Sequence, residues 1–125
     1  FTPLHQASFH GHVEVVKTLL AAEAEVDKSN KWGETPLHKA SSNGHVEVVK
    51  ALLAAKAEVD RSDASGWTPL HLASLNGRVE VVKTLLAAEA EMNKSSNSGI
   101  TPLRLSIFNS HPEVAAVLRE AGGHE

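Results

Sequence analysis

The chain has 125 residues, of which 42% are hydrophobic and 22% are charged. This length fits one domain, 1–125, and the composition is that of an ordinary globular protein rather than of a disordered or fibrous one. Twelve Lys and Arg against 15 Asp and Glu give a net charge of −3, which leaves no cation excess for a polyphosphate, so we do not expect nucleic acid as a partner. The sequence has no cysteine, which excludes disulfides and thiolate metal sites.

The apolar runs are all far shorter than the roughly 20 residues that cross a bilayer, and no signal peptide opens the sequence. We therefore expect an intracellular, cytoplasmic protein that does not insert into membranes. Stability must come from packing alone.

A repeat dominates the sequence. Thr-Pro-Leu-His begins at Thr2, Thr35 and Thr68, and Thr-Pro-Leu-Arg begins at Thr101, with an interval of 33 residues each time. Segments 34–66 and 67–99 share 22 of 33 residues without a gap. The chain is thus expected to contain four units, approximately 1–33, 34–66, 67–99 and 100–125.

Each unit opens with a predicted short helix. In the second unit, the Thr35 hydroxyl can cap free amide groups, and Pro36 suits the first helical position. Leu37, Ala40 and Ser41 then follow at helical spacing, until Asn43-Gly44 breaks the pattern. We expect about two helical turns here.

A second helix is predicted from about Val46 to Ala55. Val46, Val49, Leu52 and Leu53 form its apolar stripe, and Glu47 and Lys50 make a surface pair one turn apart. The polar segment 58–66 contains Asp, Ser and Gly, which is typical of a turn. A helix pair of this size cannot bury its apolar face alone, so the units must stack into a solenoid.

These residues resemble the ankyrin repeat: the Thr-Pro-Leu-His-X-Ala motif, the Asn-Gly-His-Val-Glu-Val-Val-Lys run and the 33-residue period. The resemblance implies an all-α ankyrin-repeat solenoid of four helix-turn-helix units, with eight helices in antiparallel pairs and polar hairpin-like tips. It covers essentially the whole chain. It also implies a protein-interaction scaffold without catalysis.

Two features depart from the family pattern. Glu23, Lys56 and Glu89 stand where the family has a left-handed glycine after the second helix, and only the fourth unit keeps one, Gly122. We expect these three residues at positive φ. In the last unit Arg104 replaces the motif histidine and Ser110 replaces a glycine, as in a terminal cap.

The repeated histidines are interpreted as scaffold. The resemblance implies that His5, His38 and His71 hydrogen-bond between neighbouring loops, and His12, His45 and His111 are interpreted in the same way. His10 and His124 are too far apart in the solenoid to chelate one ion, so no metal site is expected. No nucleophile elbow or phosphate loop occurs, so neither catalytic residues nor cofactors are predicted.

Residues that differ between the units are the candidates for partner binding. In ankyrin proteins, the corresponding positions line the concave groove and the tips. Trp32 and Trp67 are the expected anchors, because an exposed Trp is a frequent interface hot spot. The predicted partner-binding residues are Phe9, His10, Lys31, Trp32, Glu34, Ser42, Asn43, Ala64, Ser65, Trp67, Leu75, Asn76, Asn97, Ser98, Ile100 and Phe108.

Three alternatives stay open. Asn93 resembles the asparagine that hydroxylases modify in ankyrin repeats, which would make the chain a substrate or regulatory subunit of an enzyme system. The likeness between units is also compatible with an engineered ankyrin binder, although scattered changes such as Lys28 to Arg61 favour natural duplication. Finally, the first unit keeps Val13 and Val15 like an internal one, which predicts either a longer array or self-association through repeat one.

Overall fold

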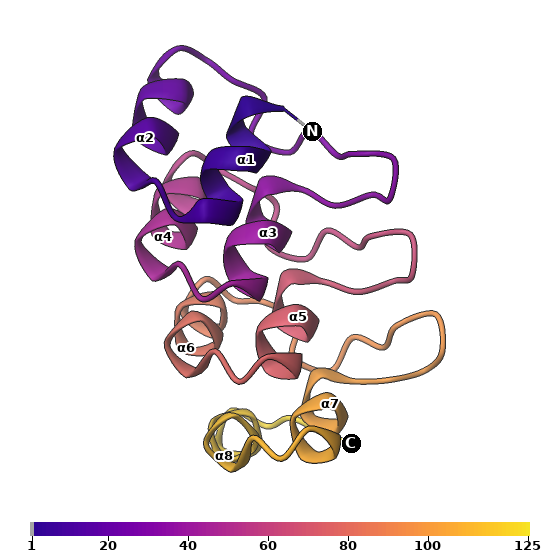
Figure 1. The fold of residues 1–125 in the computed structure, drawn as a ribbon. Helices are drawn as coiled ribbons and strands as arrows, with labels where there is room; N and C mark the ends of the chain where they lie inside the picture. Colours follow the sequence, from indigo (N-terminus) through magenta and orange to yellow (C-terminus); the bar gives the residue numbers. More distant parts are fainter. Residues whose placement is uncertain (1) are drawn as a thin grey trace.

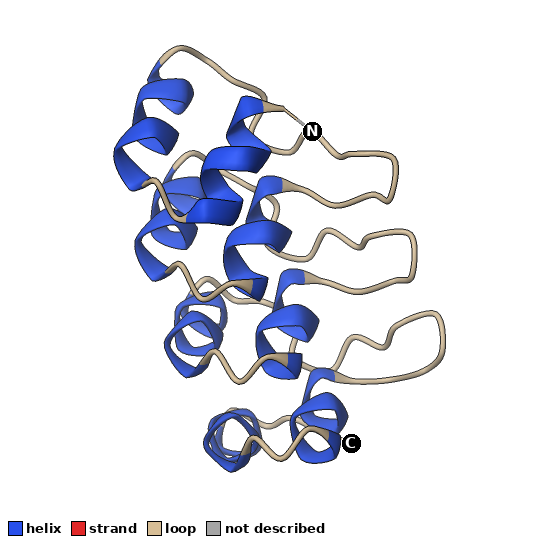
Figure 2. Ribbon diagram, viewed as in Figure 1, coloured by secondary structure: helices blue, strands red, loops and turns tan. Residues whose placement is uncertain are grey.

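The computed structural model describes residues 2–125 as a stack of helix pairs (Figure 1). In the described residues all regular structure is helical, as Figure 2 shows. The first helices of the pairs form one column, and the second helices form another column beside it. The loops that connect successive pairs extend from the first-helix column on the side away from the second helices. The elements are α1 (Pro3–His10), α2 (Val13–Ala21), α3 (Pro36–Ser42), α4 (Val46–Ala54), α5 (Pro69–Leu75), α6 (Val79–Ala87), α7 (Pro102–Phe108) and α8 (Pro112–Glu120).

Residues 2–125 form eight helices, which confirms the predicted solenoid. Each first helix packs against the first helix of the next repeat, and each second helix packs against the next second helix. The segment Val46–Ala54 is helical, as its apolar spacing predicts. None of the helices in the described residues is long and apolar enough to cross a membrane.

The first helices begin as predicted from the Thr-Pro pairs. The Thr35 hydroxyl accepts a hydrogen bond from the His38 amide, and the His38 ring accepts one from the Thr35 amide. Side chains therefore satisfy two of the amide groups that the start of a helix leaves without backbone partners. The same arrangement opens α1 and α5, whereas α7, with Arg104, keeps only the threonine half of it.

The core is a row of aliphatic side chains between the two helix columns. Leu37, Val49 and Leu52 are fully buried, as are their counterparts in the third repeat. The predicted stripe of α4 needs one correction: Val48 is only 1% exposed, while Val46 and Leu53 are half-buried. Val48 is buried because the stacked repeats cover a wider face of α4 than its partner helix alone.

The second helices end with a backbone reversal at the non-glycine residues. Glu23, Lys56 and Glu89 have φ values of 65°, 72° and 66°. The prediction of positive φ is thus confirmed: the backbone hydrogen bonds that close these helices require the left-handed conformation whatever the side chain. Ser110 also has a positive φ, 58°, where the other repeats have glycine.

Candidate partner-binding face

The motif histidines fix the spacing between neighbouring loops, as the resemblance implies. The Nε2 atom of His5 hydrogen-bonds the carbonyl of Glu34 at 2.8 Å. His38 and His71 bond the carbonyls of Trp67 and Ile100 at 2.9 and 2.8 Å. Each histidine therefore holds the residue that follows the glycine of the next tip.

These hydrogen bonds define the state of the rings. Nδ1 of His38 accepts from the Thr35 amide at 3.1 Å, so Nε2 must carry the proton that is donated to the carbonyl of Trp67. Burial lowers the pKa of His5, His38 and His71, and this effect outweighs the backbone carbonyl bond, which raises it. The rings are thus neutral structural residues rather than proton carriers.

A second set of side chains, after the first helices, ties each repeat to the one before it. His45 Nε2 donates to the carbonyl of Phe9 at 2.9 Å, and His111 Nε2 donates to that of Leu75 at 2.9 Å. Arg78 replaces the histidine and uses its Nε to bond the carbonyl of Ser42 at 3.1 Å. The predicted scaffold role is therefore confirmed for His45 and His111, and Arg78 does the same in the third repeat. No hydrogen bond of this kind is made by His12 in the described residues.

We define the tips as the segments 27–34, 60–67 and 93–100. Each tip is closed by a side-chain acceptor three residues before its glycine. Oδ1 of Asn30 accepts from the amides of Trp32 and Glu34, and Oδ1 of Asp63 accepts from the corresponding two amides of its tip. Ser96 does the same with its hydroxyl. These three acceptors were not predicted from the sequence. The pattern that would have revealed them is an Asn, Asp or Ser three residues before each tip glycine.

Adjacent tips are also joined through their backbones. The Ala64 amide donates to the carbonyl of Trp32 at 2.9 Å, and the Asn97 amide donates to that of Ser65 at 3.0 Å. Several predicted binding residues surround a hollow of about 510 Å³ between the second and third tips. The residues that line it are Asp63, Ala64, Ser65, Trp67, Asn97 and Ser98. The tips thus form a continuous, hydrogen-bonded surface.

Trp32 lies at the first tip with 53% of its surface exposed. The Lys31 ammonium sits 4.7 Å from the centre of the indole ring, a distance at which the two attract each other. Trp32 therefore has the exposure that an interface anchor needs.

Trp67 differs from Trp32. It is half-buried, and its ring stacks on the His71 imidazole with centroids 6.2 Å apart. The exposure on which its assignment as an anchor rests therefore holds only in part, because one face of the Trp67 ring packs on the repeat. Trp67 follows the tip glycine rather than preceding it, and this offset turns its ring onto the next first helix.

Phe9, on α1, lies near a lysine that also pairs with the first tip. It is 39% exposed, and the Lys39 ammonium lies 5.9 Å from its ring. Lys39 also pairs with the Glu34 carboxylate at 2.8 Å. Burial alone would raise the pKa of Glu34. The hydrogen bond from Asn30 and the ion pair with Lys39 together lower it by more than that, so the pKa of Glu34 lies below its usual value.

The remaining predicted residues at the ends of the first helices are partly engaged with each other. The Asn76 amide group donates to the Ser42 carbonyl and hydroxyl at 3.1 and 2.9 Å. Asn43 bonds back to the carbonyl of Lys39 in its own helix. His10 is exposed and packs edge-on against Phe9. These polar residues are fixed in position, as a preformed surface requires.

The last repeat adds a second phenylalanine to this side. Phe108 is 64% exposed, and the Arg104 guanidinium lies 5.1 Å from its ring. Two further predicted binding residues, Leu75 and Ile100, are half-buried. We name the three tips together with the exposed side of the first helices the tip face.

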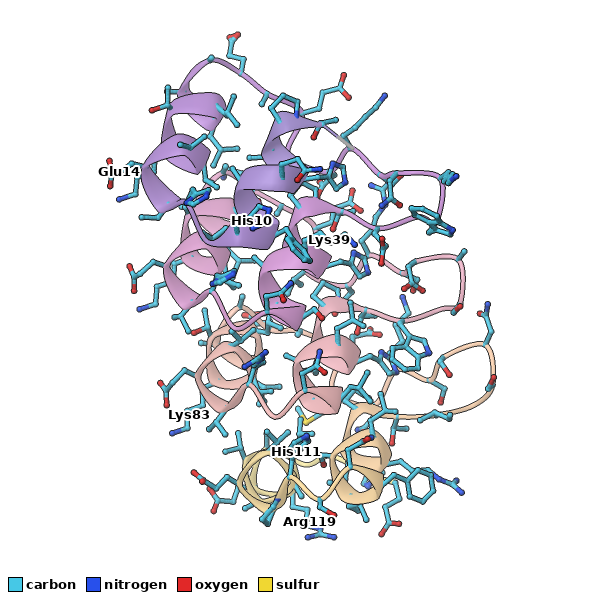
Figure 3. The ribbon with its side chains drawn as sticks, viewed as in Figure 1. His10, Glu14, Lys39, Lys83, His111 and Arg119 are labelled. Atoms are coloured by element: carbon cyan, nitrogen blue, oxygen red, sulfur yellow. The ribbon has the colours of Figure 1, made fainter. Side chains whose placement is uncertain are left out.

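The opposite side of the molecule carries charges that neutralise each other. Glu14 and Lys17 on α2 are 3.8 Å apart, and the equivalent pairs on α4 and α6 are both 3.6 Å apart. Figure 3 shows Glu14 and Lys83 on this side and Lys39 toward the tips. These columns are solvated ion pairs, as predicted, and contribute little to stability.

Asn93 lies at the start of the third tip, in the column of Asp27 and Asp60. Its Oδ1 accepts from the His124 amide at 2.7 Å, and its Nδ2 lies 3.4 Å from the Gly122 carbonyl. The exposed side chain of Asn93 is therefore tied to residues 122–124 by its amide group. Within residues 2–125, no cluster of three His, Asp or Glu side chains could hold a metal ion.

Comparison with known proteins gives the family. A family model described as ankyrin repeats (3 copies) matches residues 4–96 and again 58–125. No curated protein matches the sequence. The two family matches together run from residue 4 to the end of the chain, and the chain therefore belongs to the ankyrin repeat family.

Proposed function

We propose that this ankyrin-repeat chain binds another protein through its tip face and performs no chemistry of its own. Ankyrin repeats are generally protein–protein interaction modules. One observation carries the assignment to the tip face. The described part of the chain has four exposed large hydrophobic residues, and three of them lie on this face: Phe9, Trp32 and Phe108. Exposed aromatic side chains on a rigid surface are the usual anchors of an interface.

The electrostatics support the same side. The second-helix side pairs its Glu and Lys columns internally, so it has little left to offer a partner. On the tip face, Lys31 and Arg104 lie over aromatic rings rather than beside carboxylates. A cation over an aromatic ring presents apolar surface and charge to a partner at one place.

The preformed backbone of the tip face lowers the cost of binding. The backbone bonds between tips and the Asn76–Ser42 bond hold the surface before a partner arrives. Little conformational entropy is then lost on association. We place this binding in the cytoplasm, where a chain without cysteine needs no disulfides.

A photo-crosslinking amino acid placed at Ser65, which is exposed on the second tip, or at Leu75 tests the proposal. Lys50, on α4, is the matched control position on the opposite side. We expect the two tip-face positions to crosslink the same protein from a cell extract, and the control position not to. Crosslinking mainly from Lys50 would place the interface on the second helices instead.

Once the partner is captured, Trp32→Ala should weaken its affinity by about 2 kcal/mol or more, as at an interface hot spot. The chain's stability should barely change, because the side chain is exposed. Trp67→Ala should lower both affinity and stability, since Trp67 also packs on His71. Normal binding by both variants would remove the tryptophans from the interface.

Hydroxylation of Asn93 is the second proposal, and it is compatible with protein binding. What favours it is the exposure of Asn93 at the base of a tip. Co-expression with an asparaginyl hydroxylase, followed by mass spectrometry, should add one oxygen to Asn93 and none to Asn30. An unmodified Asn93 would exclude this proposal.

A further inference from the structure

The outer face of the first repeat exposes side chains that are buried in the other repeats. Val15 is 50% exposed, whereas Val48 and Val81, at equivalent positions, are 1% exposed. Leu19 is half-buried and Leu52 is fully buried. A hollow of about 340 Å³ opens on this face. The residues that line it are Thr2, Pro3, Leu4, Leu19, Ala24, Glu25 and Lys28. We call this surface, together with His12 and Val15, the first-repeat face.

The first-repeat face also ends a column of hydrogen-bond donors. His45, Arg78 and His111 each donate to a carbonyl of the preceding repeat, at 2.9, 3.1 and 2.9 Å. His12 occupies the same position in the first repeat, but no described group accepts a hydrogen bond from its ring. The His12 ring stacks instead on the His10 ring, with the two ring centroids 5.8 Å apart.

A second column ends at the same face. Asp27 accepts from the Glu58 amide at 3.0 Å, and Asp60 accepts from the Glu91 amide at 2.9 Å. The residue equivalent to Glu58 and Glu91 in the first repeat is Glu25. Its amide donates to no described acceptor, so two polar columns and one apolar row stop together at the first-repeat face.

The opposite end of the stack does not continue these columns. A Cβ atom on Gly11 or Gly77 would lie 2.6 Å from Nδ1 of His45 or His111, so these glycines make room for the histidine of the following repeat. The fourth repeat has Ser110 at this position, and its side chain fills that room. A second copy stacked head to tail would press His12 against Ser110.

Charge excludes the same arrangement. In the fourth repeat, exposed Arg119 and Glu120 stand where α2 has Leu20 and Ala21. Figure 3 shows Arg119 at the free end of the stack, beyond α8. The residues equivalent to Arg119 in the two internal repeats, Leu53 and Leu86, are half-buried. Head-to-tail stacking would therefore partly desolvate the Arg119 guanidinium against the apolar first-repeat face without a partner for its charge.

We propose that the first-repeat face binds a further ankyrin-type repeat, stacked in the register of the three repeat–repeat contacts within this chain. The occupant presents a carbonyl at the end of its first helix to His12, with a glycine two residues later to clear the imidazole. It places an Asp or Asn side chain at the Glu25 amide. Its apolar side chains cover Val15 and Leu19. This surface is distinct from the tip face.

The test extends the chain by one repeat. A copy of residues 34–66 is joined directly before residue 1, which keeps the 33-residue register. We expect the amides of α2 to gain at least about tenfold protection from hydrogen exchange, because their repeat becomes internal. A matched extension with Gly44→Ser in the added copy should lose most of this gain, because that serine reproduces the obstruction at Ser110.

His12 provides a readout that general stabilisation does not move. In the 125-residue chain, His12→Ala should leave the urea midpoint unchanged. In the extended chain it should lower the midpoint, as His45→Ala does in both chains. A second extension, with residues 67–99 added instead, guards against one unsuitable junction. The proposal would be overturned if neither extended chain folded. It would also be overturned if, in both extended chains, the amides of α2 gained no protection and His12→Ala left the urea midpoint unchanged.

Self-association is the competing outcome. Sedimentation equilibrium of the 125-residue chain should show a monomer over the micromolar range. A dimer that Val15→Glu dissociates would show that a second copy covers the first-repeat face, and would overturn the assignment to an additional repeat.

Discussion

Val15 and Arg119 lie on the outer surfaces of the two terminal repeats, yet one is apolar and the other is charged. The fourth repeat has changed at three positions where the internal repeats meet the repeat that follows: it carries Arg104, Ser110 and Arg119 in place of the repeated residues. The first repeat keeps the internal sequence, and Val15 is 50% exposed as a result. The comparison teaches that in a repeat protein the substituted positions, more than the repeated ones, mark which end faces water.

The largest expected effect separates the first repeat from an internal one. Leu52→Ala should lower the free energy of unfolding by about 2 to 5 kcal/mol, the range for a fully buried leucine. Leu19→Ala, at the equivalent but half-buried position, should cost less than half of that. Urea unfolding of the two variants measures the difference. Equal losses would show that the first-repeat face is as well packed as the interior.

The helix ends provide a second contrast, between the first three repeats and the fourth. Lys56 has a φ of 72°, so Lys56→Gly should stabilise the chain by about 1 kcal/mol. Gly122, at the same position in the fourth repeat, has a φ of 98°, and Gly122→Ala should destabilise it. Thermal unfolding of both variants gives the signs. A destabilised Lys56→Gly variant would mean that the lysine side chain makes a contact that outweighs the strain.

Buried serines differ between the repeats in a smaller way. The hydroxyls of Ser41 and Ser74 are buried without a hydrogen-bond partner, whereas Ser106 donates to the Leu103 carbonyl at 2.7 Å. Ser41→Ala should therefore raise the free energy of unfolding by about 1 kcal/mol, the low end of the cost of an unsatisfied buried hydroxyl. Ser106→Ala should lower it slightly. If both variants lose stability, the Ser41 hydroxyl has a partner in solution.

The smallest expected effect is a pH dependence. Burial lowers the pKa of His38 and His71 in the folded chain, so below about pH 6.5 the unfolded chain binds more protons. Stability is fully present above that pH and declines as the pH falls toward the folded-state pKa. Urea unfolding at pH 7 and pH 5 should show this loss, and His71→Gln should reduce it.

Much of the fold follows from the sequence, because local signals and tertiary contacts agree. Thr35-Pro36 begins a helix, Asn43-Gly44 ends it, and the repeat carries both signals through the chain. The positive φ of Glu23 was predictable from the family pattern even though its side chain opposes it. The role of Trp67 was not, because a shift of two positions relative to the tip glycine decides which way the ring turns. No propensity encodes that direction.

The candidate site was only partly predictable for a similar reason. Sequence variation between units located the tips and the ends of the first helices. It could not show that Asn76 and Ser42 bond each other, or that Lys39 connects Phe9 to Glu34, because these contacts join different repeats. That His12 lacks the hydrogen bond of its equivalents became visible only from the bonds that His45, Arg78 and His111 make.

Native-state hydrogen exchange on the 125-residue chain tests most directly whether the two ends differ as described. Both α2 and α8 belong to terminal repeats, but α8 buries Val114, Ala115 and Leu118, whereas α2 buries only Val16 among its described residues. We predict that the amides of α2 exchange faster than those of α8, and that both exchange faster than those of α4. Equal protection of α2 and α8, or faster exchange in α8, would contradict an open first-repeat face and a closed C-terminal end.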